Sequence, residues 1–268
     1  MQGSLGEKIG EGAFADVHAW APGQVIKLFK TGVPRRIALH EARMTRVVFA
    51  AGVPAPEVFD EVTLEGRFGI VLQRLDGPNL RQLSRSGTIS PLQVGAILAA
   101  LAISVHKTPA PPEVLSLYDW MDGSLRVSVG IPQQIAAGIL TLIERLPPGD
   151  RLCHCDLHSG NVIMTADGPR LIDWFGIVRA PAALDLGLCQ LLSELLWEIV
   201  DDPERPRAVN AAMQSEYARL TDMSPAALTA AIDPYLPIGC AFALLSGTFP
   251  VQRERLIQRV TDAMISED

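Results

Sequence analysis

Cysteine pairs, long apolar runs and an excess of positive charge are all missing from this chain. It has four cysteines among 268 residues, and none forms the Cys-x-x-Cys pair that zinc ribbons use. So few unpaired cysteines are typical of a reduced, cytoplasmic protein. No run reaches the roughly 18 apolar residues that indicate a membrane-spanning helix, because the longest, Val94–Val105 and Leu236–Val251, are shorter or broken by Gly and Pro. The N-terminal stretch MQGSLGEKIGEG lacks the apolar core of a signal peptide. We therefore expect a cytoplasmic location and no membrane partner.

The shortage of positive charge restricts the partners further. Lys and Arg number 23 against 30 Asp and Glu, which gives a net charge of −7. Because attraction to backbone phosphates dominates nonspecific nucleic-acid binding, we expect no nucleic-acid partner. A cationic or small neutral ligand fits this charge better. Arg outnumbers Lys and Ala is abundant, which is typical of a GC-rich bacterial source. Oligomeric state leaves no signal in the sequence.

Strand patterns fill the first part of the chain and helical patterns fill most of the rest. A helix with Pro34 in its first turn and Gly52 at its end interrupts the strands. An Asp76-Gly77-Pro78 turn precedes the helical part, which indicates a small β-rich unit, a linker and a larger helical unit. The predicted strands are Leu5–Gly10, Ala15–Trp20, Val25–Phe29, Val58–Leu64 and Phe68–Gln73. The main predicted helices are Pro91–Lys107, Pro132–Leu146, Ala183–Val200, Pro206–Leu220 and Gln252–Ile265.

The stretch CHCDLHSGNVIMTADGPRLIDWFG, Cys153–Gly176, gathers acidic, amide and imidazole side chains. Asp156 can accept the proton of a hydroxyl group, while Asn161 and Asp173 can offer oxygen ligands to a hard divalent cation. The Ala166–Gly168 turn folds two short β segments back on each other, so that Asn161 and Asp173 can face the same cleft. Each residue alone is common in an ordinary loop. Their combination favours a metal with a general base beside it.

The two histidines of this stretch allow another interpretation. His154, Asp156 and His158 form a His-x-Asp-x-His pattern, which is compatible with a transition-metal hydrolase. The alternative for His154 is a buried imidazole that holds the loop through backbone hydrogen bonds, and we favour it. His158 is compatible with a structural or a solvent-facing position. The hydrolase hypothesis also leaves the N-terminal features unused.

Those N-terminal features are a glycine-rich turn and a lysine within an apolar strand. Gly10 and Gly12 let the backbone approach phosphate oxygens, although a glycine-rich hairpin is the ordinary explanation. The turn matches neither the dinucleotide fingerprint nor the P-loop. Lys27 either lies at a solvated strand edge or points towards phosphates. In the second case a carboxylate must hold it, and Glu41 on the following helix is best placed.

The order of these motifs resembles the protein-kinase-like superfamily, most closely the aminoglycoside phosphotransferase and choline kinase group. His154-Cys155-Asp156-Leu157-His158 is similar to that group's catalytic loop, which usually reads His-Gly-Asp-Leu-His. Ile172-Asp173-Trp174 is similar to its metal-binding segment, and Asp185 matches a downstream aspartate that braces the loop. The segment between Asp173 and Asp185 is too short for the activation segment of a protein kinase, which favours a small-molecule acceptor.

The resemblance implies an α+β, bilobal protein-kinase-like fold. Its small N-lobe is an antiparallel sheet with one helix and binds the nucleotide (1–73). A hinge (74–79) and a larger, mainly helical C-lobe with the catalytic loop and acceptor site (80–268) follow. By the same resemblance Asp156 is the catalytic base, Asn161 and Asp173 bind Mg²⁺, and Lys27, oriented by Glu41, contacts the phosphates of ATP or GTP. The other implied site residues are Gly10, Gly12 and Gln73 for the nucleotide, and His154 and Asp185 as supports of the loop.

Two departures from the family pattern stand in the sequence. Cys155 replaces the usual glycine of the catalytic loop, which makes the loop bulkier, and a thiol exposed there would be open to oxidation. Ala15 stands where protein kinases have the third glycine of their nucleotide loop. Neither change removes a catalytic group.

The sequence thus predicts a Mg²⁺-dependent kinase that moves the γ-phosphoryl group of ATP or GTP to a hydroxyl of a small molecule. An aminoglycoside-like antibiotic, an amino alcohol or a sugar fits this description, and the sequence does not distinguish them. The alternatives are a non-catalytic nucleotide-binding protein, a protein kinase and, last, a metal-dependent hydrolase. Four acidic residues lie in or just past one predicted helix: Glu194, Glu198, Asp201 and Asp202. They are compatible with a cationic acceptor or with a solvated acidic surface, and we favour the surface.

Overall fold

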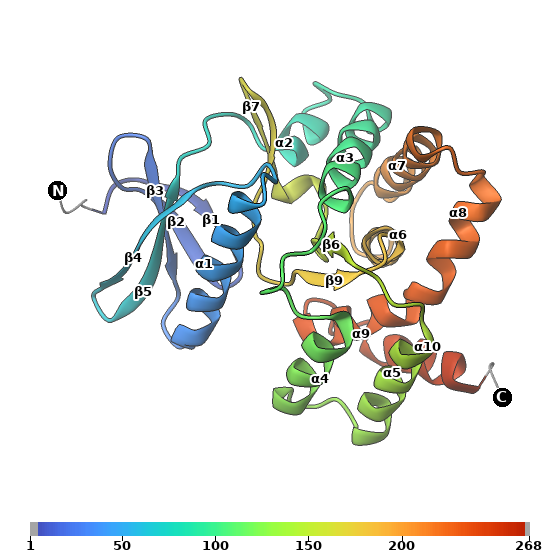
Figure 1. Ribbon diagram of the computed structural model, residues 1–268. Helices are drawn as coiled ribbons and strands as arrows, with labels where there is room; N and C mark the ends of the chain where they lie inside the picture. Colours follow the sequence, from blue (N-terminus) through green and yellow to red (C-terminus); the bar gives the residue numbers. More distant parts are fainter. Residues whose placement is uncertain (1–4, 266–268) are drawn as a thin grey trace. The chain divides into compact units, whose positions relative to one another are not determined.

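A computed structural model describes residues 5–265 and divides the chain into two compact units (Figure 1). The first unit comprises residues up to Gln82 together with Gly160–Phe175, and the second comprises Leu83–Ser159 and the chain from Gly176 onwards. A five-stranded antiparallel sheet dominates the first unit, and helices dominate the second. The predicted α+β fold class is thereby confirmed. The outermost residues of both predicted lobes, 1–4 and 266–268, lie outside the described residues.

The sheet of the first unit has the strand order β1-β2-β3-β5-β4. Helix α1 covers one of its faces (Figure 1), and small apolar residues such as Ala38 and Ala42 let the helix approach Phe29 and Ile70 of the sheet. Hydrophobic burial of this kind gives the sheet an ordered surface from which polar side chains can project. The elements are β1 (Lys8–Glu11), β2 (Ala15–Ala19), β3 (Gln24–Phe29), α1 (Arg35–Ala50), β4 (Val58–Leu64) and β5 (Arg67–Gln73).

A short hairpin from the middle of the chain also belongs to the first unit. Strands β7 (Val162–Thr165) and β8 (Gly168–Leu171) pair with each other, and the hairpin is fixed by hydrogen bonds from Met164 N to Pro78 O and from Leu171 N to Pro54 O. These backbone hydrogen bonds attach residues 160–175 to the first unit.

The second unit buries one large apolar cluster among its helices. Ser90 begins α3 with a capping box, in which its hydroxyl accepts from Gln93 N and the Gln93 side chain accepts from Ser90 N. Helix α6 packs against α7, α8 and α9 (Figure 1). The elements here are α3 (Pro91–His106), α4 (Leu117–Val127), α5 (Gln133–Arg145), β6 (Arg151–Cys153), β9 (Val178–Ala180), α6 (Ala183–Trp197), α7 (Glu204–Thr221), α8 (Pro225–Ile232), η2 (Asp233–Tyr235), α9 (Leu236–Ser246) and α10 (Arg253–Ile265). Two short helices, α2 (Leu80–Arg85) and η1 (Ser159–Asn161), lie where the chain passes between the units.

One stretch among the described residues is long and apolar enough to cross a membrane by length and composition. It is Pro225–Ser246, with a mean hydropathy of 1.5 and 39% of its apolar window buried. The sequence prediction missed it because the η2 turn joins α8 and α9 without a break. Gly187 and Leu191 of α6 lie against Tyr235 and Gly239 of this stretch, and such close packing is typical of a core helix.

Candidate active site

Lys27 shares one face of the sheet with the glycine-rich turn. The antiparallel register places Gly10 opposite Val17, Val17 opposite Lys27, and Lys27 opposite Ile70. Residues directly opposite each other in neighbouring strands project from the same face. Ile70 belongs to the cluster beneath α1, so the lysine projects towards that helix. The turn itself is closed by a hydrogen bond from Gly12 N to Ala15 O at 2.8 Å.

Lys27 lies between two carboxylates. Its Nζ is 2.5 Å from Glu41 Oε1 on α1 and 3.1 Å from Asp173 Oδ1 after β8. The side chains of Lys27 and Glu41 are 17% and 7% exposed, whereas that of Asp173 is 41% exposed. Glu41 is therefore the interior partner, and Asp173 is the accessible one.

The electrostatics of this cluster favour a charged lysine. Burial alone would lower the pKa of Lys27, but the nearby Glu41 and Asp173 carboxylates outweigh burial and raise it. Burial, with help from the charge of Asp173, raises the pKa of Glu41, while Lys27 opposes that shift. A fixed cation that faces an accessible carboxylate is a suitable place for an anionic group and a divalent metal ion together.

Asn161 and Asp173 lie at the same end of the β7–β8 hairpin. Asn161 directly precedes β7, Asp173 follows soon after β8, and Ile172 N donates to Asn161 O at 2.9 Å. Asn161 is buried, and Asp173 has a φ of 70°, which is unusual for a residue other than glycine. Amide and carboxylate oxygens suit Mg²⁺, so the chemistry of this donor pair fits the metal that the family pattern implies.

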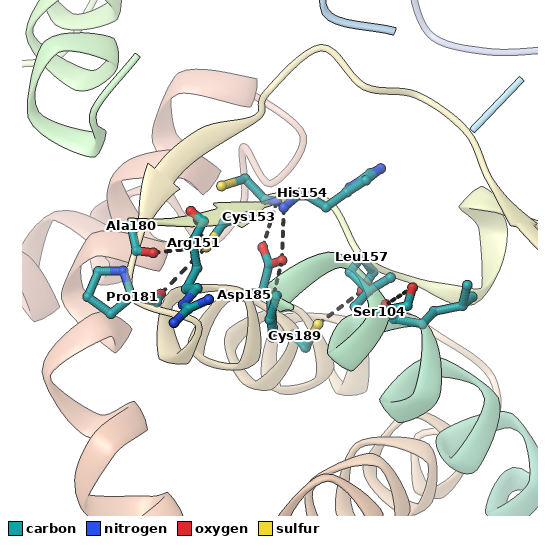
Figure 2. A network of polar contacts seen from close by, with 12 residues as sticks. Ser104, Arg151, Cys153, His154, Leu157, Ala180, Pro181, Asp185 and Cys189 are labelled. Atoms are coloured by element: carbon teal, nitrogen blue, oxygen red, sulfur yellow. Dashed lines mark hydrogen bonds and ion pairs between the residues drawn. The ribbon is translucent and has the colours of Figure 1, made fainter. Parts of the chain in front are cut away.

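The loop that carries Asp156 is held from below by Asp185 of α6. Figure 2 shows both carboxylate oxygens of Asp185 accepting backbone hydrogen bonds, Oδ2 from His154 N at 2.8 Å and Oδ1 from Cys155 N at 2.7 Å. His154 is fully buried, and its Nδ1 accepts from Asp156 N at 3.2 Å. The Asp156 side chain is 53% exposed, with Oδ1 3.5 Å from His158 Nε2. These contacts leave the carboxylate of Asp156 accessible, while the backbone of its loop is held by buried hydrogen bonds.

Two residues that the sequence did not indicate extend this support. His106, at the end of α3, places Nε2 3.0 Å from Asp185 Oδ2, and its Nδ1 lies 3.0 Å from the hydroxyl of Tyr217 on α7. Burial would raise the pKa of Asp185, but the His106 contact and the backbone amides lower it overall. Burial raises the pKa of Tyr217 to about 12. A lone histidine in the apolar pattern of Pro91–His106 was the available signal.

The Cys155 thiol is buried, so it is not open to oxidation from solvent. The residue is only 8% exposed, and burial raises the pKa of its thiol well above the ordinary value. Its φ of 62° is left-handed, a conformation that glycine adopts without strain. This geometry explains why the family usually has glycine at this position.

His106, Cys153 and Asp185 also bring ligand atoms within 4.8 Å of one another. Their groups are already engaged, because Asp185 accepts the hydrogen bonds described above and the Cys153 thiol contacts Pro181 O at 3.5 Å. We therefore interpret these three buried residues as part of the support of the loop and not as a metal site.

The acidic residues of the α6 region are largely paired with arginines. Glu194 lies 2.8 Å from Arg259 of α10, and Glu198 contacts Arg255 of the same helix. Asp202 is 3.0 Å from Arg205, which neutralises a third carboxylate locally. This pairing supports the solvated-surface interpretation over a site for a polycation.

Gln73 lies at the end of β5, half-exposed. Its backbone N–H donates to Glu57 O at 2.8 Å, and its Oε1 accepts from Glu57 N at 3.4 Å. Arg74 N donates to Gly23 O, so backbone hydrogen bonds fix the beginning of the predicted hinge. The role of Gln73 in binding the base of the nucleotide stays a prediction.

The kinase-like fold is shared with many solved structures, including the three that follow. One is a Plasmodium vivax ethanolamine kinase, at 14% identity over 95% of this chain and 80% of the other, with a TM-score of 0.57. Another is a putative fructosamine-3-kinase from Haemophilus somnus 129PT, at 10% identity over 96% and 91%, with a TM-score of 0.63. The third is the ternary complex of streptomycin and ATP with APH(2″)-IIa, at 17% identity over 98% and 91%, with a TM-score of 0.54.

Residues 15–223 match the family model of the phosphotransferase enzyme family, so this chain belongs to that family. The resemblance drawn from the motifs is thereby confirmed. Among curated proteins no sequence matches significantly.

Proposed function

We propose that this protein transfers the γ-phosphoryl group of ATP or GTP to a hydroxyl group of a small molecule, with Mg²⁺. The observation that carries the proposal is the contact of Lys27 with both Glu41 and Asp173 on the unit that also bears the glycine-rich turn. A hydrolase has no need of such a buried lysine, whereas a nucleotide site uses it against phosphate oxygens. Family membership supports the same reaction class.

Each proposed residue has a separate part in the reaction. Asp156 takes the proton of the acceptor hydroxyl as the hydroxyl oxygen attacks the γ-phosphorus and the bond from this phosphorus to the leaving ADP or GDP breaks. The exposed carboxylate of Asp156 suits that task. Lys27 binds phosphate oxygens, Glu41 keeps it in place, and Gly10 and Gly12 let backbone N–H groups approach the nucleotide. Asn161 and Asp173 hold Mg²⁺, which when bound neutralises charge on the β- and γ-phosphates. His154 and Asp185 keep the backbone of the loop in position, and Gln73 lies next to the base of the bound nucleotide.

A small-molecule acceptor is favoured for two reasons. Only strand β9 and a short turn separate Asp173 from α6, which leaves no room for a long activation segment that docks a protein substrate. The similar structures bear the names of kinases for ethanolamine and fructosamine and of a phosphotransferase with bound streptomycin. Because arginines pair with Glu194 and Glu198, we rank amino alcohols and sugars above polycationic antibiotics. A cytoplasmic site of action, where ATP and GTP are available, follows from the proposal.

A screen that couples ADP or GDP release to a spectroscopic signal tests this function. The panel contains choline, ethanolamine, sugars, hydroxy amino acids, aminoglycosides and macrolides, each with ATP and with GTP. We expect release that requires both Mg²⁺ and one class of small acceptor. Nucleotide binding without release for any acceptor would favour a non-catalytic protein, and transfer to added proteins would favour a protein kinase. Bound zinc or iron, with activity indifferent to Lys27→Met, would favour a hydrolase.

A further inference from the structure

Helix α1 contacts the segment that follows β8 through a second residue beside Glu41. His40 directs Nε2 to the backbone carbonyl of Phe175, at 3.1 Å. The His40 and Phe175 rings also meet edge to face, with centroids 5.3 Å apart and an interplanar angle of 78°. Neighbouring helical residues point about 100° apart, so α1 reaches Lys27 with one side chain and Phe175 with the next.

The hydrogen bond fixes which nitrogen of His40 carries a proton. A carbonyl oxygen only accepts, so Nε2 must donate. Burial lowers the pKa of His40, which favours the neutral ring with its proton on Nε2. The bond therefore does not require a charged imidazole beside Lys27 and the proposed metal site.

Asp173 has a backbone conformation that needs support from its surroundings. Its φ of 70° is one that residues other than glycine rarely adopt, and such conformations persist where neighbouring contacts hold them. On one side Ile172 N donates to Asn161 O, and the Trp174 indole donates to Leu171 O at 2.8 Å. On the C-terminal side of Asp173, His40 of α1 forms a hydrogen bond with the backbone carbonyl of Phe175.

We propose that His40 is a positioning residue for Asp173. It holds the backbone beyond the proposed metal ligand against α1, so that the carboxylate stays at a fixed place relative to Lys27 and to Asn161. This inference rests on the proposed function, because it takes Asp173 to be a ligand of Mg²⁺. Outer contacts of this type typically change metal affinity or activity by about 10- to 100-fold when they are removed.

His40 is not needed to dock α1 on the sheet. Ala38 and Ala42 are fully buried along the helix and provide the apolar contact with the strands. Loss of His40 should therefore leave the fold intact, as circular dichroism and thermal unfolding can verify. His18 is a matched control, because its Nδ1 also lies 3.1 Å from a backbone carbonyl, Gly6 O, on the β2 strand of the same unit.

The test compares His40→Ala, His40→Gln and His18→Ala with the wild type in the full-length chain. Binding of ADP is measured by calorimetry over a series of Mg²⁺ concentrations, and exchange of the backbone amides of residues 173–177 is measured by mass spectrometry. We expect His40→Ala to raise the Mg²⁺ concentration for half-maximal ADP binding about tenfold and to speed exchange in this segment. The affinity for ADP without metal should stay within about twofold of the wild-type value, since the ion pair of Lys27 with Glu41 is unchanged.

Rescue by glutamine separates positioning from packing. His40→Gln retains a donor at a similar reach but lacks the ring, so it should recover most of the Mg²⁺ dependence, while His18→Ala should match the wild type. Wild-type Mg²⁺ dependence in His40→Ala, or equal loss in His40→Ala and His40→Gln, would overturn the inference while leaving the proposed function intact. A wild-type protein whose ADP binding ignores Mg²⁺ would overturn both.

Discussion

Cys155 provides a test of backbone geometry in the loop that carries the proposed base. Its φ of 62° costs about 1–2 kcal/mol for a residue with a Cβ, and glycine relieves that strain. Glycine also loses about 0.5–1 kcal/mol more than alanine through its greater freedom in the unfolded chain. The balance makes Cys155→Gly more stable than Cys155→Ala by about 0.5–1 kcal/mol. Both variants lose the same buried sulfur atom, and they differ in packing only by the Cβ that alanine keeps.

A second buried cysteine gives the matched control. Cys189 lies within α6, where its thiol contacts Leu157 O at 3.0 Å. In a helix interior glycine is less favourable than alanine by about 1 kcal/mol, so Cys189→Gly should be less stable than Cys189→Ala. We therefore expect the difference in the free energy of unfolding between the glycine and the alanine variant to have opposite signs at the two positions.

Urea unfolding of the four variants, followed by circular dichroism, measures both differences. The free energy of unfolding should be higher for glycine at position 155 and higher for alanine at position 189. If alanine is the more stable residue at both positions, the left-handed conformation of Cys155 is wrong, and so is the explanation of the family's usual glycine.

Three further predictions concern buried charges and thiols. Lys27→Met should lower the free energy of unfolding by about 3 kcal/mol, because it leaves the Glu41 carboxyl in the interior without its partner. Adding Glu41→Leu should restore most of that stability without restoring nucleotide binding, and recovered binding would contradict the phosphate role of Lys27. The pKa of Asp185 is lowered on folding, so its contribution to stability is complete above about pH 4 and is lost as the pH falls through the lowered value. Thermal unfolding between pH 3 and pH 7 should thus show a weaker acid dependence for Asp185→Asn than for the wild type, and equal dependence would refute this assignment. The cysteines are all buried, with pKa values raised by burial, so iodoacetamide at pH 8 should label them only after unfolding, and rapid native labelling of Cys155 would contradict its burial.

The elements with a regular apolar period were predictable from the sequence. The helix expected between Pro34 and Gly52 is α1, and the helix expected at Pro132–Leu146 is α5, because prolines and a glycine limited both. Helix α4, Leu117–Val127, was missed because Gly123 and Ser124 interrupt its helical pattern. Ser116 caps its beginning, and buried residues on one face hold it in the apolar cluster.

Contacts between distant residues were harder to predict. Strands β6 and β9 have three residues each and pair across the catalytic segment, so neither carries a pattern of its own. The support of Asp185 was equally hidden, because His106 reaches Asp185 from α3 and is itself contacted by Tyr217 of α7. The motif residues could be proposed from the sequence because the proposed phosphoryl transfer requires specific side chains, whereas their supports only need to fit the surrounding structure.

Replacement of Asp156 by asparagine tests the central claim most directly. The change keeps the shape of the side chain and the backbone contacts of the loop but removes the group proposed to accept the acceptor's proton. With the acceptor found in the release screen, Asp156→Asn should bind Mg²⁺–ADP with wild-type affinity, while kcat falls by about two or more orders of magnitude. Turnover at the wild-type rate in this variant would contradict the assignment of Asp156 as the base and, with it, the proposed mechanism.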